Sequence, residues 1–175
     1  AEPKNLQGVK LHQLYFGRYL LFFVLGQIQA LVVVLGDIYL LHCQILDKGL
    51  FWFTASLTSF VFTLLVYSLT LSFGAIGKAV AVVIMVIQIA GSGGTFPIEL
   101  LPSVYRNIYI FFPFPYAINA MRETIGGMYG NMYVKSLLQL MIFAVAALVL
   151  GLVIRKPFIK WNHFVEKRME DTKMM

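Results

Sequence analysis

The chain has 175 residues, of which 59% are hydrophobic and only 13% are charged, and its mean hydropathy is +0.79. Soluble domains carry about 25% charged residues, so this composition excludes an ordinary soluble domain and predicts an integral membrane protein. The net charge of +6 does not indicate nucleic-acid binding, because the basic residues are scattered at the ends of apolar segments and form no face with stacking aromatics.

The N-terminal residues predict a short amphipathic helix at a membrane surface. Leu11, Leu14 and Tyr15 have the spacing of one helix face, and Arg18 is expected to close this helix by reaching toward the headgroups. The segment has no initiator Met and no signal-peptide pattern. We therefore expect the chain to be the C-terminal part of a larger, permease-like protein.

Four apolar segments follow, and each is long enough to cross a hydrocarbon core of about 30 Å or most of it. They lie at about 19–41, 50–73, 79–96 and 136–154. A tight turn at Gly74–Lys78 separates the second from the third, and the third weakens where glycines begin at Gly91. The expected fold is an all-α, polytopic transmembrane bundle of four spans that forms one membrane domain over 1–175, ending in a cytoplasmic tail at 155–175.

The segment between the last two spans, about 97–130, combines apolar residues with repeated breaks. Gly and Pro interrupt it, yet it stays rich in Phe, Tyr and Ile. Such backbone survives at membrane depth only where protein or a water-filled cavity covers its polar groups. We expect broken or re-entrant outer helices here, which act either as an exit gate or only as a stable cap. The candidate gate residues are Gly91, Gly93, Gly94, Pro97, Glu99, Pro102 and Arg122.

The distribution of Lys and Arg predicts the topology. Four spans put both chain ends on one side, and that side receives ten of the 14 basic residues. The opposite side receives Lys48, Arg106, Arg122 and Lys135. By the positive-inside rule both ends are cytoplasmic, and the broken segment is extracytoplasmic.

Polar residues inside the spans have two interpretations. Gln27, Asp37 and Gln88 are the polar positions singled out there, and an ionisable residue in a span suggests function by default. Asp37 lies near the outer interface, however, so a structural role is favoured over proton coupling. The many Ser and Thr residues of the second span are expected mainly to bond helices together rather than to line a solute path.

No motif for catalysis, a cofactor or a metal stands out. Gly77-Lys78 lacks the earlier Gly and the following Ser or Thr of a phosphate loop, because Ser72 and Ala79 occupy those positions. The three His residues lie in separate segments, and the lone cysteine, Cys43, excludes an internal disulfide. We expect no enzyme and no cofactor. A hydrolase built from residues scattered in the sequence remains the open alternative.

Two stretches around the broken segment, GSGGTFPIELLP and PFPYAINAMRETIGG, resemble the signature of the YhgE/Pip (phage infection protein) family. The first span, GRYLLFFVLGQIQALVVVLGD, is similar to that family as well. The family in turn is similar to the permeases of type-2 ABC exporters, which have six spans with broken outer helices between the fifth and sixth. The resemblance implies that the chain carries spans three to six, and that Val9–Arg18 is a remnant of a contact with an ATPase.

The sequence and this resemblance together predict an ABC-2-type permease subunit for export or surface assembly, which moves solute or lipid/polymer across the plasma membrane of a Gram-positive bacterium. The expected partners are the lipid bilayer, a second copy in a homodimer and a separate ATPase subunit, without nucleic acid. The alternative is a membrane anchor for an extracellular phage-receptor or type VII secretion-associated region. A polar track along an interface would favour transport, and a bundle sealed by Leu, Val and Phe would favour anchoring.

Overall fold

The computed structural model describes residues 11–92, 94, 100 and 103–154. Within these ranges all regular structure is helical. The long helices are α1 (Leu11–Leu35), α2 (Lys48–Gly91) and α5 (Met132–Val149), and α1 and α5 continue as the π-helical turns η2 (Gly36–Leu40) and η5 (Leu150–Ile154). Between α2 and α5 lie α3 (Ser103–Ile108), the 3-10 turn η4 (Tyr109–Phe111) and α4 (Phe114–Gly126).

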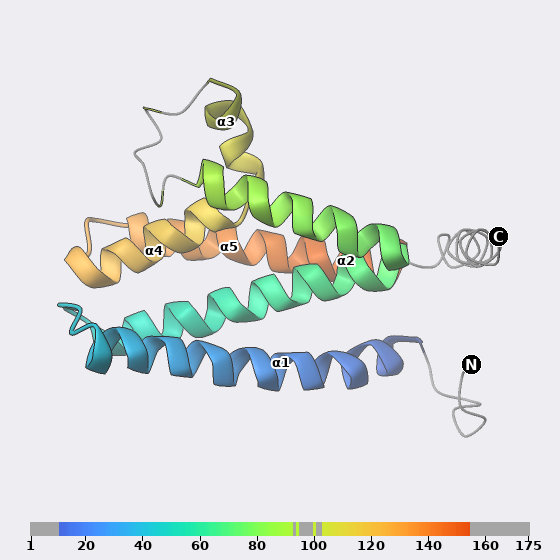
Figure 1. Cartoon of the computed structure of the whole chain (residues 1–175), viewed down its shortest axis with the longest axis horizontal. Helices are drawn as coiled ribbons and strands as arrows, with labels where there is room; N and C mark the ends of the chain where they lie inside the picture. The colour runs from blue at the N-terminus through green and yellow to red at the C-terminus, as the bar shows by residue number, and fades with distance from the viewer. Residues whose placement is uncertain (1–10, 93, 95–99, 101–102, 155–175) are drawn as a thin grey trace, which may run out of the picture.

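Helix α2 is a hairpin of two helical arms, 48–73 and 75–91, because Gly74 breaks it. Gly74 has φ 59° and ψ −130°, a conformation that residues with a Cβ avoid. Figure 1 shows the second arm running back alongside the first. The turn expected at Gly74–Lys78 is therefore confirmed, and helix α2 ends at Gly91, where the sequence predicted weakening.

The two ends of the bundle differ in what they carry. α1 begins, α2 turns and η5 ends at one end, which we name the terminal end (Figure 1). Tyr15 holds it together: its hydroxyl lies 2.6 Å from Ser68 Oγ, and its ring leaves no room for a Cβ at Gly151. Ser72 Oγ adds a hydrogen bond to the carbonyl of Leu150 at 3.1 Å. The connection between α1 and α2 and the loop after α4 lie at the opposite, loop end.

The core formed by the described residues consists of two clusters. The larger joins α1, the first arm of α2, α4 and α5 around Val61, Leu64 and Leu140. The smaller lies near the loop end and contains Val34 and Phe51. Outside these clusters the three long helices carry exposed apolar side chains, for example Leu21, Val83 and Ile142. Apolar surface all round a bundle requires hydrocarbon as its solvent.

Three helical stretches are long and apolar enough to cross a membrane: His12–Leu40, Lys48–Ile89 and Met132–Val153. The chain is thus a multi-pass, all-helical membrane protein. Lys48–Ile89 contains the predicted span 50–73 and the first part of the predicted span 79–96, and the Gly74 turn divides the two. The whole of the expected cytoplasmic tail, 155–175, lies outside the described residues.

Two helices start at positions different from those expected from sequence. Leu11–Gly17 is not a separate surface helix, since α1 runs through Arg18 without a break. The reason is Tyr15, which is only 1% exposed because it packs against α2 and η5. The last long helix begins at Met132, earlier than Ser136, because Tyr133 is also buried and its hydroxyl lies 3.0 Å from Thr54 Oγ1.

Candidate functional site

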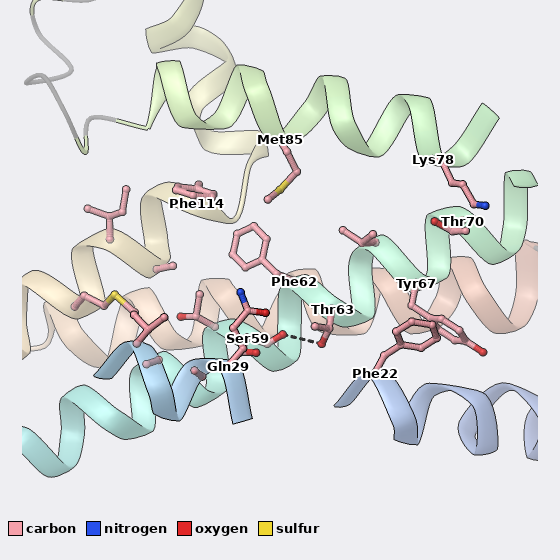
Figure 2. A pocket seen from close by; sticks show the side chains of 18 residues that line it. Phe22, Gln29, Ser59, Phe62, Thr63, Tyr67, Thr70, Lys78, Met85 and Phe114 are labelled. Atoms are coloured by element: carbon pink, nitrogen blue, oxygen red, sulfur yellow. Dashed lines mark hydrogen bonds between the residues drawn. The ribbon is translucent and has the colours of Figure 1, made fainter. Parts of the chain in front are cut away.

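A lateral groove of about 870 Å³ runs along the bundle between α1, the two arms of α2 and α4. Its floor is the face of the first α2 arm that carries Ser59, Thr63 and Thr70 (Figure 2). Phe22 and Gln29 of α1 form one side, and Met85 belongs to the other. The hairpin at Gly74 creates this groove, because the second arm lies beside the first and, as Figure 1 shows, away from α1.

The groove is apolar over most of its surface, with large flexible or aromatic side chains on its walls. Phe62 and Phe114 meet edge-on with ring centroids 5.3 Å apart, and Phe22 lies against Tyr67 at 5.6 Å. Figure 2 shows Met85 above Phe62 and the Phe22–Tyr67 pair nearer the terminal end. An occupant would therefore touch mainly hydrocarbon, sulfur and ring faces.

Most hydroxyls of the first α2 arm hold helices together, as the sequence favoured. Ser59 Oγ donates to the carbonyl of Gly26 at 2.8 Å, and Thr63 Oγ1 donates to the carbonyl of Ser59 at 2.7 Å. Tyr19 adds a contact from its hydroxyl to Thr63 Oγ1 at 3.2 Å. These donors are already used, so the middle of the floor offers an occupant mainly methyl and methylene groups.

Two polar side chains that line the groove, Thr58 and Gln29, do not share the helix-to-helix bonding of the other hydroxyls. Thr58 Oγ1 is buried and, among the described residues, is the buried side-chain polar atom with no hydrogen-bond partner. Gln29 lines the same groove from α1 and is exposed. An orphaned buried hydroxyl is costly in an apolar setting, so Thr58 marks a place in the groove suited to a hydrogen-bonding partner, and Gln29 adds a second polar group to the lining.

Lys78 supplies the positive charge of the groove. It follows the Gly74 turn, is exposed and lines the groove beside Thr70 at the terminal end (Figure 2). Arg18 lies four residues before Phe22, hence on the same face of α1 and one turn nearer that end. The described part of the chain contains no ion pair to either cation.

The intramembrane polar residues singled out in the sequence lie at three separate places. Gln27 belongs to the packing between α1 and α2: its Nε2 donates to the carbonyl of Ser56 at 3.1 Å, and its Oε1 accepts from Ser56 Oγ. Asp37 is half-buried in η2, where its carbonyl accepts from Cys43 N at 3.0 Å. Neither lines the groove.

Gln88 ties the outer helices to the bundle. It is only 3% exposed, and its Oε1 accepts from Phe114 N, the first amide of α4, at 3.3 Å. Pro113 and Pro115 fit this helix start, since the first turn of a helix has no intrahelical partners for its amides. Gln88 thus satisfies a donor that the helix cannot.

The candidate gate residues are only partly described. Gly93, Pro97, Glu99 and Pro102 lie outside the described residues. Gly91 is buried at the end of α2, and a Cβ at Gly94 would lie 2.9 Å from Ile118 Cδ1 of α4. Arg122 is exposed on α4, and its neighbour Glu123 accepts from Tyr129 N at 2.6 Å, which secures the turn after that helix.

A buried tyrosine fixes the start of α4. The Tyr116 hydroxyl donates to the carbonyl of Ile110 at 2.9 Å. Burial raises the pKa of Tyr116 above its ordinary value, and the nearby Tyr109 raises it further. The phenol therefore stays a neutral donor at physiological pH. Among the described residues no group of three or more His, Cys, Asp or Glu side chains could hold a metal ion.

Sequence reasoning missed the groove residues Gln29 and Lys78. The sequence offered one indication for Gln29, since it lies seven residues after Phe22 and therefore on the same helix face. The sequence does not show which neighbour that face meets. Lys78 was used only to predict the membrane topology. Nothing local shows that it opens into a groove with Phe22, which lies 56 positions earlier.

Comparison with known proteins identifies the family. The protein family described as "ABC-2 family transporter protein" matches residues 5–153. "Uncharacterized protein YhgE" of Bacillus subtilis (strain 168) is 32% identical over 120 residues, which cover 68% of this chain and 16% of that relative. No solved structure matches. The chain thus spans about a sixth of the length of YhgE, the resemblance drawn from the sequence is confirmed, and the chain belongs to the ABC-2 family of transporter proteins.

Proposed function

We propose that this chain is the permease-like transmembrane part of an export or surface-assembly system that moves a solute, lipid or polymer across the plasma membrane of a Gram-positive bacterium. The carrying observation is the lateral groove, in which a largely apolar wall combines with Gln29, the orphaned Thr58 hydroxyl and a cation at one end. Such a surface suits a partly apolar substrate better than a sealed bundle would.

The proposed topology has four crossings with both ends in the cytoplasm. The two arms of α2 have 26 and 17 residues, or about 39 and 26 Å of helix, against a core of about 30 Å. Contacts of Tyr15 and Ser72 support a common end for α1 and η5. The excess of Lys and Arg assigned to that end supports its cytoplasmic location.

The broken outer segment is proposed as the exit cap, with Gly91 and Gly94 as the positions where α2 gives way to it. Gln88 and the close approach of Gly94 to Ile118 support a firm attachment of α4. A gate at this place would move α4 as one piece. Gly94→Leu should then impair export, whereas Gly126→Leu, where nothing lies within 4 Å of the added Cβ, should not. Equal export by both variants would contradict a gate and would support a segment that acts only as a stable cap.

Transport requires an energy source, and none of the motifs in this chain supplies one. We propose a separate ATPase subunit and a homodimeric arrangement, in keeping with the family. Purification of the full-length protein from native membranes in mild detergent, followed by identification of associated proteins, tests this. We expect a nucleotide-hydrolysing subunit to copurify, and its reproducible absence would contradict the proposal.

A groove-filling substitution tests the path itself. Val33 lines the groove from α1, and its neighbour Val32 is similarly exposed but does not. Val33→Trp in the full-length protein should reduce the export or resistance phenotype of a complemented deletion strain, and Val32→Trp should not. Full complementation by Val33→Trp would refute transport along the groove.

The second candidate is a membrane anchor for an extracellular phage-receptor or type VII secretion-associated region. It is favoured by the two closed core clusters and by the hydroxyls that bond helix to helix. On this proposal no ATPase copurifies, and both Trp variants leave every surface phenotype intact.

A further inference from the structure

We propose that the terminal end of the lateral groove binds one phospholipid with an anionic headgroup, taken from the leaflet on that side. Its phosphate lies between Arg18 and Lys78, and an acyl chain follows the apolar wall toward Phe114. The site needs only insertion into a membrane, so it goes beyond the proposed function and does not depend on transport or on an ATPase.

Charge complementarity selects the headgroup. Lys78 on the second α2 arm lines the groove at this end, Arg18 lies one turn before Phe22 on α1, and the described residues supply no carboxylate to either. Two cations to which the described residues supply no carboxylate favour a lipid with a net negative headgroup over a zwitterionic one near a membrane surface. Both side chains have long apolar stems, which allow their charged ends to reach the headgroup region.

The lining beyond the mouth suits an acyl chain. Phe22, Phe62, Met85 and Phe114 give a continuous hydrocarbon and ring surface from the terminal end inward. Along the first α2 arm the groove extends from Thr70 to Ala55, fifteen residues or about 22 Å of helix. This exceeds the roughly 15 Å of one leaflet of a 30 Å core. A chain anchored at Lys78 therefore stays inside the groove.

The size of the groove is compatible with one lipid chain, since its volume is about 870 Å³. A volume of this size is typical of pockets that enclose one small, largely apolar ligand. The orphaned Thr58 lies twelve residues from Thr70, about 18 Å along the helix, and so is remote from the proposed headgroup.

Lipid retention by the full-length protein tests the headgroup site. The purified protein in mild detergent is equilibrated with phosphatidylglycerol or phosphatidylcholine, and retained lipid is measured by native mass spectrometry. We expect preferential retention of phosphatidylglycerol, weakened about fivefold by Lys78→Gln and again by Arg18→Gln. Lys135→Gln is the charge-matched control, since Lys135 is exposed at the loop end, outside the groove. Equal loss in Lys78→Gln and Lys135→Gln, or no preference between the lipids, overturns the proposal.

A second measurement tests the position of the acyl chain. Phosphatidylglycerol with a photoreactive group in its acyl chain should label peptides that contain Phe62 or Phe114. Met85→Trp narrows the groove and should reduce this labelling, whereas Val86→Trp, on the neighbouring exposed face of the same helix, should not. The proposal is overturned if Met85→Trp leaves the labelling unchanged. It is also overturned if the groove is cross-linked to a protein segment in place of lipid. Both measurements proceed without transport, so a failed export assay leaves their outcome unaffected.

Discussion

The turn of the α2 hairpin depends on a close approach that only glycine permits. A Cβ on Gly77 would lie 2.2 Å from the carbonyl oxygen of Leu69 and 3.0 Å from the Cβ of Phe73. An ordinary contact begins near 3.4 Å, so the two arms would have to separate by 1.2 Å, the difference between 3.4 and 2.2 Å. The obstructing atom is backbone and cannot turn aside as a side chain would.

The expected cost of Gly77→Ala follows from two opposed effects. Overpacking costs about 1–3 kcal/mol, and we take the upper value because backbone must move. Replacing a helical glycine by alanine returns about 1 kcal/mol. The net loss is about 2 kcal/mol, or a fall in Tm of about 4–8 °C for a chain of this size.

Thermal unfolding of the purified protein in detergent, followed by size-exclusion chromatography after heating, measures the effect. Gly17→Ala is the matched control, since Gly17 is also helical and nothing lies within 4 Å of the added Cβ. Its Tm should stay level or rise. If Gly77→Ala melts as late as Gly17→Ala, the close packing of the hairpin turn is wrong.

Three further predictions concern single side chains. Thr58→Val removes an unpartnered buried hydroxyl and should leave Tm unchanged or higher. Ser68→Ala loses the hydrogen bond to Tyr15 and should lower the free energy of unfolding by about 1 kcal/mol. A lower Tm for Thr58→Val would show that its hydroxyl has a partner. Asp47→Ala removes the side chain that caps α2 at Leu50 N and should cost about 1 kcal/mol in the same unfolding assay. Cys43, exposed at the loop end, should react with a membrane-impermeant maleimide in intact cells, and protection until lysis would invert the proposed topology.

The broad architecture was readable from the sequence because it depends on local patterns. Long apolar runs predicted the helices, and clustered glycines predicted the turn at Gly74 and the end of α2 at Gly91. The family resemblance rested on residues close together in the chain and was confirmed. Exact helix starts were less accessible: the segment 11–17, expected as a separate surface helix, is continuous with the rest of α1, and Tyr15 packs it against α2.

The candidate site was much less predictable. Gln27 and Gln29 have the same chemistry and lie two residues apart, yet Gln27 bonds to Ser56 while Gln29 faces the groove. Residues two apart on a helix point in different directions, but the sequence does not say which face meets a neighbour. Gln88 was predicted to be intramembrane, while its contact with Phe114 N required the position of α4.

By itself the sequence determined that this protein is an all-helical membrane chain of the ABC-2 family with an interrupted segment between its last two long helices. Hydropathy, helix breakers and charge act over a few residues, so their consequences are written locally. Only the tertiary structure decided that α1 and the second α2 arm stand apart and leave a groove with Lys78 at one end. The reason is physical: a groove is the space between faces brought together from distant segments, and no local pattern encodes which faces fail to meet.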